Sequence, residues 1–165
     1  MHNALVHEIE LYPSETFKTL LDHEVNRSHR YGDSLTLVDM VVEADPPSPE
    51  SQHSAEVFAI NALNVYLRTT DIPCKKDNEF FILMPATGAQ GARTACERLK
   101  KLMIVNEQPF DKVSFKLRAF IGLATLPNND MSVTSDILSQ HAAQALQHAR
   151  TNQITNVVYF SEAMK

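Results

Sequence analysis

The sequence predicts an α/β sandwich, in which helices pack on a mixed sheet. Long helical stripes of apolar residues, clearest over Ala55–Leu67, alternate with short runs rich in β-branched and large apolar residues. These segments follow the order helix, strand, helix, hairpin, helix, strand, helix, strand, which indicates helices layered on a sheet. The chain has 165 residues, 44% of them hydrophobic, which is enough for one domain (1–165) with a substantial core.

Composition excludes several classes of protein. The net charge of −5 argues against broad nucleic-acid binding through phosphate contacts, although a local basic pocket can still take a small anionic ligand. Cys74 and Cys96 form no metal-spaced motif and are expected to be reduced thiols. The chain shows neither a signal-peptide pattern nor an apolar run of membrane-spanning length. We therefore expect a cytoplasmic protein that binds neither nucleic acid nor membrane.

The first elements follow from caps and periodicity. Residues 1–13 form a lead-in that fits a helix, an extra strand or a tail equally well. Ser14 is suited to cap a helix whose apolar residues repeat with helical spacing and which should end near Tyr31-Gly32. Ser34–Val42 then predicts a buried strand, because it is rich in β-branched and large apolar residues.

The next stretch leads to a hairpin. Ala44–Ser54 is predicted to be a loop, since its prolines and polar residues oppose regular structure. The amphipathic helix Ala55–Leu67 follows and delivers Arg68 at its end. Two short strands are then expected at Asp71–Lys75 and Glu79–Met84, joined by a turn whose Asp and Asn tolerate left-handed backbone.

The second half of the chain completes the alternation. A turn at Thr87-Gly88 precedes a helical stripe from Ala92 to Met103. Strict alternation of apolar residues predicts a strand over Val113–Thr125. A last helix is expected at Thr134–Arg150, and Asn156–Phe160 is expected to close the sheet.

The hairpin region carries a family resemblance. Arg68-Thr-Thr-Asp71 is an Arg-x-x-Asp pair, and Glu79 to Pro85 is an apolar strand that ends in Pro. This stretch resembles the signature hairpin of the GGDEF family, the bacterial diguanylate cyclase domains, in which such a pair precedes a Gly-Gly-Asp/Glu-Glu-Phe tip. The resemblance extends from about Ser14 to Phe160. It implies a nucleotidyl-cyclase-like mixed sheet flanked by helices.

The tip of the hairpin departs from the family pattern. Lys76, Asp77 and Asn78 stand where the two glycines and the first acid belong, whereas Glu79 and Phe80 match. Glycines at the tip let the backbone approach a nucleotide closely, which side chains at these positions oppose. We therefore expect a degenerate GGDEF-like domain.

The acids that the resemblance assigns to metal binding are also altered. Counting from Leu35, the Asp-x-Asp positions of the first strand fall on Val41 and Glu43, and Asp39 lies two residues earlier on the same face. The hydrocarbon side chain of Val41 cannot bind a divalent cation, and the hairpin acid Glu79 alone does not hold two. We therefore expect no catalytic residue, metal ion or cofactor, and a pseudo-diguanylate cyclase instead of an enzyme.

The resemblance implies a second site, which this sequence keeps. In the family, the Arg-x-x-Asp pair is the inhibitory site for the product, cyclic di-GMP, and a second arginine falls here on Arg98. An Arg fork can donate to guanine O6 and N7 or to a phosphate, and a carboxylate can accept from the guanine N1–H and N2–H₂ edge. The simpler interpretation is that Arg68, at a helix end, only pairs with the nearby acid Asp71.

These observations lead to one main hypothesis and two alternatives. We expect a second-messenger receptor or regulator that binds cyclic di-GMP through Arg68, Asp71 and Arg98 and acts on an unidentified downstream protein. A homodimer is expected, and the ligand can favour its assembly by lying between protomers. The alternatives are an interaction or dimerisation module that binds no ligand, and an active diguanylate cyclase.

Overall fold

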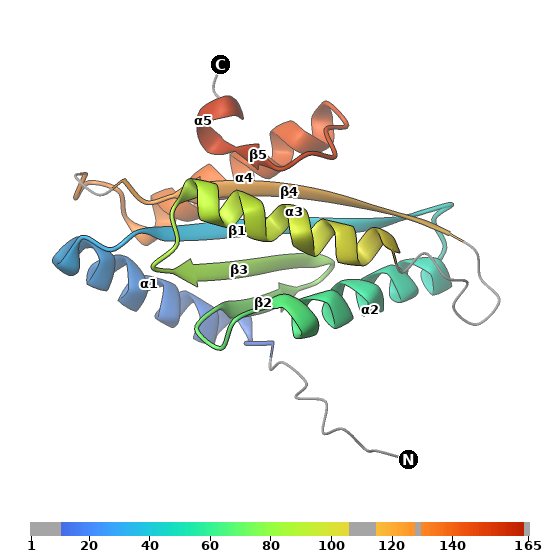
Figure 1. Cartoon of the computed structure of the whole chain (residues 1–165), viewed down its shortest axis with the longest axis horizontal. Helices are drawn as coiled ribbons and strands as arrows, with labels where there is room; N and C mark the ends of the chain where they lie inside the picture. The colour runs from blue at the N-terminus through green and yellow to red at the C-terminus, as the bar shows by residue number, and fades with distance from the viewer. Residues whose placement is uncertain (1–10, 106–114, 128–129, 164–165) are drawn as a thin grey trace, which may run out of the picture.

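The structure, a computed structural model, describes residues 11–105, 115–127 and 130–163 (Figure 1). Helices and strands alternate along the chain largely as the sequence predicts. Their bounds are α1 (Ser14–Tyr31), β1 (Leu35–Asp45), α2 (Pro49–Tyr66), β2 (Ile72–Lys76), β3 (Glu79–Pro85), α3 (Ala89–Val105), β4 (Lys116–Thr125), α4 (Ser135–Thr151), β5 (Val158–Tyr159) and α5 (Phe160–Ala163).

The strands form one mixed sheet in the order β2-β3-β1-β4-β5. The central strand β1 is antiparallel to both β3 and β4, whereas β5 runs parallel to β4. Helices α2 and α3 cover one face of this sheet, and α1 and α4 cover the other (Figure 1). The predicted α/β sandwich with a mixed sheet is therefore confirmed.

Both faces of β1 are buried. Val38 and Met40 point toward α2 and α3, while Leu37 and Val41 point toward α1 and α4. A strand covered on both sides is expected to be almost continuously apolar, which explains why its sequence shows no polar face. Thr36 and Asp39 are buried polar exceptions, and Asp39 places a carboxyl group in this strand with only 1% of the residue exposed.

The prediction of a loop over Ala44–Ser54 is wrong. Strand β1 continues to Asp45, and α2 begins at Pro49. Ser48 caps α2: its side chain accepts a hydrogen bond from the Ser51 N–H, and the Ser51 side chain accepts one from the Ser48 N–H. A proline in the first turn of a helix is tolerated, because its missing N–H would have no partner within the helix.

Smaller differences concern the ends of elements. Pro13, and not Ser14, is the N-cap of α1, and β5 is short because Phe160 already begins α5. The C-terminal end of α1 follows the prediction: Gly32 adopts a left-handed φ of 73° and its N–H donates to the Ser28 carbonyl at 2.8 Å. Most of the lead-in (residues 1–10) and Val113 lie outside the described residues.

The edge strand β2 has a contact from the chain that precedes α1. The Tyr12 N–H donates to the Pro73 carbonyl at 2.9 Å, and Tyr12 forms a parallel bridge with Cys74. In the described part of the chain, no helix is long and apolar enough to cross a lipid bilayer.

Candidate functional site

The end of α2 and the start of β2 hold Arg68 and Asp71 together. Leu67 leaves the helix with extended backbone, and the Asp71 N–H donates to the Arg68 carbonyl at 3.0 Å, which closes a tight turn. The Asp71 carboxylate accepts hydrogen bonds from the Arg68 backbone N–H at 2.9 Å, from Nε at 3.3 Å and from Nη2 at 2.9 Å. The Arg-x-x-Asp spacing therefore produces an ion pair with two side-chain hydrogen bonds, and the bond from the Arg68 backbone N–H holds the Asp71 carboxylate within the same turn.

The two partners of this pair differ in exposure. The Asp71 side chain is 4% exposed, whereas the Arg68 side chain is 54% exposed. The hydrogen bond that Arg68 donates to the Asp71 carboxylate is the main cause that raises the pKa of Arg68 above its usual value. Asp71 thus acts as a buried anchor, and Arg68 presents a permanently charged group at the surface.

A third contact reaches Arg68 from the turn between β3 and α3. Nη2 of Arg68 donates to Thr87 Oγ1 at 2.6 Å, and the Thr87 hydroxyl donates to the Pro85 carbonyl at 2.9 Å. Sequence reasoning missed this role of Thr87 and assigned the residue only to a turn. The only available signal was its position two residues after the proline that ends β3.

These residues line a cavity of about 610 Å³. Arg98 of α3 lines it too, is exposed, and has no hydrogen bond or ion pair to any residue that the structure describes. The structure therefore brings the three predicted binding residues, Arg68, Asp71 and Arg98, to one cavity. The complete lining is Tyr66, Arg68, Asp71, Met84, Ala86, Thr87, Gly88, Gln90, Gly91, Thr94, Ala95 and Arg98.

The altered hairpin tip lies away from this cavity. Asp77 has a left-handed φ of 56°, as the turn prediction requires, and Lys76 pairs with Glu79 across the hairpin. The Lys75 ammonium group contacts Glu56 of α2 at 3.0 Å and the Asp77 carbonyl at 2.5 Å. Phe80 is fully buried in the core. None of Lys76, Asp77, Asn78, Glu79 and Phe80 lines the Arg68 cavity.

A second polar cluster lies on the α4 face of the sheet. Glu79 faces Val41 across the β1–β3 pair, so Asp39 is its diagonal neighbour on the same face. Burial, with the nearby Glu79 carboxyl group as a further cause, raises the pKa of Asp39 to about 9. Within the described residues, Asp39 Oδ1 has no hydrogen-bond partner.

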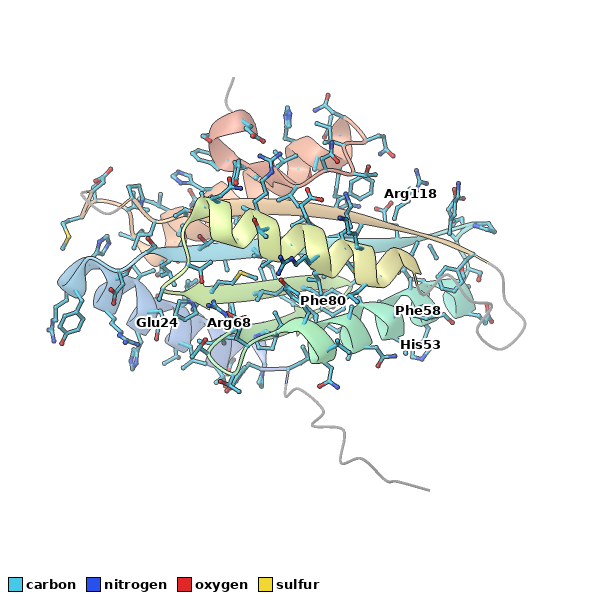
Figure 2. The ribbon with its side chains drawn as sticks, viewed as in Figure 1. Glu24, His53, Phe58, Arg68, Phe80 and Arg118 are labelled. Carbon is cyan, nitrogen blue, oxygen red and sulfur yellow. The ribbon has the colours of Figure 1, made fainter. Side chains whose placement is uncertain are left out.

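Glu43 and Arg150 extend this cluster. They form an ion pair at 3.1 Å and line a shallow cavity of about 340 Å³. Figure 2 shows Arg118, whose backbone pairs with Glu43, far along the sheet from Arg68. The polar cluster around Glu43 and the Arg68 cavity are therefore separate sites.

The carboxylates of this cluster can be compared with the two divalent cations that the resemblance implies. The Val41 side chain offers no ligand atom, Glu43 is paired with Arg150, and Asp39 is held in its protonated form near neutral pH. Among the described residues, no three His, Cys, Asp or Glu side chains are grouped so that they could hold a metal ion. These side chains do not fit the implied ligand set, so no reaction step is assigned to them.

Comparison with known proteins identifies the family. A family model described as the GGDEF domain of diguanylate cyclases matches residues 57–156, more than half of the chain. The chain belongs to the GGDEF family. A search of curated proteins found no match.

Solved GGDEF structures share the fold. The GGDEF domain of DgcB from Caulobacter crescentus, in complex with c-di-GMP, has a TM-score of 0.77 at 12% identity, with 92% of each chain covered. The active GGEEF domain of a Vibrio cholerae diguanylate cyclase has a TM-score of 0.74 at 17% identity, covering 92% of this chain and 98% of that one. SiaD from Pseudomonas aeruginosa, a diguanylate cyclase in complex with its activator SiaC, has a TM-score of 0.79 at 22% identity, covering 90% of this chain and 58% of that one.

The family assignment corrects one prediction. The sequence led us to expect a pseudo-cyclase that is not an enzyme, and that prediction is wrong: the matched family is one of diguanylate cyclases, and the similar structures include an active domain. The inference gave too much weight to single side chains, at Val41 in the first strand and at the hairpin tip. Divalent cations in nucleotide sites are held partly by substrate phosphates and water, so the protein ligands alone are a poor guide to activity.

Proposed function

We propose that this GGDEF domain binds cyclic di-GMP in the cavity formed by Arg68, Asp71 and Arg98 and acts as a receptor or regulator in cyclic di-GMP signalling. The observation that carries the proposal is the convergence of these side chains, from the end of α2, the start of β2 and the middle of α3, on one cavity.

The chemistry of the cavity suits this ligand. Its volume of about 610 Å³ is within the range of small-molecule sites. Two guanidinium groups and one carboxylate give a local positive charge in a chain whose net charge is −5. Cyclic di-GMP carries two phosphates, which attract guanidinium groups, and two guanines, whose edges offer both acceptors and donors.

The simpler interpretation accounts for only part of the site. Arg68 does pair with Asp71, as a helix-end arginine often does with a nearby acid. That pairing does not explain why Arg98 lines the same cavity without an ion-pair partner among the described residues. The structure of DgcB in complex with c-di-GMP, on the same fold, adds support for this ligand.

We further propose that the chain forms a homodimer that the ligand stabilises. Arg68 and Arg98 are exposed, so a ligand bound to them keeps part of its surface open, which a second protomer related by two-fold symmetry can cover. A protein partner is also part of the proposal, by analogy with SiaD, which was solved in complex with its activator.

Calorimetric titration with cyclic di-GMP, with GTP as a comparison ligand, tests the proposal. Loss of a guanidinium contact should cost about 1–3 kcal/mol, so Arg68→Ala and Arg98→Ala should each weaken binding at least five-fold. Arg118→Ala is the matched control, because this exposed arginine pairs with Asp45 at 3.7 Å and lies far from the cavity (Figure 2). Absence of binding by the wild-type chain would support the ligand-free interaction module instead.

A further inference from the structure

The hydrogen bonds of Arg68 use its Nε and Nη2 donors. A guanidinium group has five N–H donors, one on Nε and two on each Nη. Asp71 takes the Nε donor and one Nη2 donor, along one edge of the group. Thr87 Oγ1 takes the other Nη2 donor, which belongs to the end edge. Only the two donors of Nη1 have no partner among the described residues.

Thr87 is itself held firmly in place. Its carbonyl accepts a hydrogen bond from Thr36 Oγ1 of the central strand at 2.8 Å, and its hydroxyl donates to the Pro85 carbonyl at 2.9 Å. Thr36 is fully buried, and its hydroxyl also lies 2.8 Å from that of Thr125. The acceptor that Arg68 meets is therefore fixed to the centre of the sheet.

The backbone beside Thr87 is strained in a way that fits this role. Ala86 adopts a φ of 52°, a left-handed conformation that is strained for a non-glycine residue. Such conformations persist where the surroundings impose them, and they occur often at ligand sites. Here the bond from Thr36 to the Thr87 carbonyl and the contact with Arg68 both depend on the turn at Ala86.

We propose that Thr87 is a positioning residue, which fixes the Arg68 guanidinium so that it donates to the ligand through Nη1 alone. The inference rests on the proposed function. A two-bond fork to guanine O6 and N7 needs two parallel donors from one edge, and at Arg68 each such edge already holds Asp71 or Thr87. Arg68 therefore meets a single acceptor oxygen, on a phosphate or a guanine, and Arg98 supplies the two-bond fork.

Two substitutions of Thr87 test the positioning role in the full chain. Thr87→Val keeps the shape but removes the hydroxyl, and should weaken cyclic di-GMP binding roughly three- to ten-fold, the effect of one lost hydrogen bond. Thr87→Ser keeps the hydroxyl and should bind within two-fold of wild type. Arg98→Lys, which keeps the charge but loses the fork, should weaken binding nearly as much as Arg98→Ala.

A measurement without ligand tests whether Thr87 fixes the Arg68 guanidinium, independently of cyclic di-GMP binding. In nitrogen-15 NMR of the wild-type chain, rotation of the Arg68 Nη groups should be slow, and Thr87→Val should make it fast while Thr87→Ser does not. One outcome overturns the positioning role alone: wild type binds cyclic di-GMP, Arg68→Ala loses that binding, and Thr87→Val binds as tightly as wild type. If wild type binds no cyclic di-GMP, the proposed function falls, and the positioning role falls with it. Fast rotation of the Arg68 Nη groups in the wild-type chain would by itself show that Thr87 does not fix the guanidinium group.

Discussion

The carboxyl group of Asp39 is buried in the central strand beside that of Glu79, and the two occupy diagonal positions on one face of the sheet. Burial is the main cause that raises the pKa of Asp39 to about 9, and Glu79 adds to it, while Arg150 opposes it. Asp39 is therefore a neutral acid inside the fold at physiological pH, which makes the stability of the protein depend on pH.

The direction of that dependence follows from proton binding. Below about pH 4 Asp39 is protonated in both the folded and the unfolded chain, so its contribution is fully present. Between pH 4 and about 9 only the folded chain keeps the proton, so the free energy of unfolding should fall as pH rises, by at most about 1.4 kcal/mol per pH unit. Urea denaturation at pH 5, 7 and 8.5 measures the slope.

Asp39→Asn should flatten that slope, because the amide has the same shape and no proton to lose. The variant is expected to be more stable than wild type above pH 7. Asp33→Asn, at an exposed position, is the control and should follow wild type. Identical slopes in wild type and Asp39→Asn would show that Asp39 is ionised in the folded protein.

Much of this architecture can be predicted from the sequence, because the sheet and its helices are set by local apolar periodicity. The strand around Val38 and the helix after Ala55 are examples. The start of α2 could not be placed in this way. A segment rich in proline is usually a loop. Here, however, the reciprocal hydrogen bonds between Ser48 and Ser51 cap a helix that begins at Pro49.

The candidate site shows the same division. The local pair Arg68–Asp71 was predictable, because both residues share one turn. The contact of Arg68 with Thr87 joins residues 19 positions apart, and the face of the sheet that carries Asp39 is covered partly by α4, which comes much later in the chain. Contacts of this kind depend on the packed structure and leave no periodic signal in the sequence.

Two glycines should differ sharply in their tolerance of alanine. Gly32 has a φ of 73°, but a Cβ there would meet no atom within 4 Å, so Gly32→Ala should cost only about 1–2 kcal/mol of conformational strain. At Gly122 a Cβ would lie 2.3 Å from the Leu146 backbone nitrogen. Gly122→Ala must push α4 away from β4 and should cost more. Thermal unfolding of both variants measures the difference; equal losses would mean that α4 shifts freely.

Substitutions of Asp71 and Arg98, which both line the cavity, should differ in their effect on the stability of the fold. Asp71→Ala removes a buried acceptor of three hydrogen bonds and should destabilise the fold by about 1–3 kcal/mol as well as weaken binding. Arg98→Ala removes an exposed group that has no ion-pair partner among the described residues, and should change stability by less than about 0.5 kcal/mol. Chemical denaturation beside calorimetry measures both. A large loss of stability in Arg98→Ala would reveal a structural role for this arginine.

Assembly offers an independent test of the proposed function. If cyclic di-GMP lies between two protomers, it binds the dimer better than the monomer and shifts the equilibrium toward dimer by mass action. Analytical ultracentrifugation at increasing ligand concentration should show this shift, and Arg98→Ala should reduce it. A dimer that forms equally without ligand, or a monomer at saturating ligand, would contradict the linkage.

The contact of Tyr12 with β2 has a consequence for the solubility of the protein. An edge strand exposes unpaired backbone groups, which can add a strand from another molecule and start aggregation. Here Tyr12 occupies the Pro73 carbonyl, and Pro73 itself has no N–H to offer. Tyr12 therefore protects this part of the open edge of the sheet. A chain shortened to begin at Pro13 should keep its cavity but aggregate more readily at high concentration.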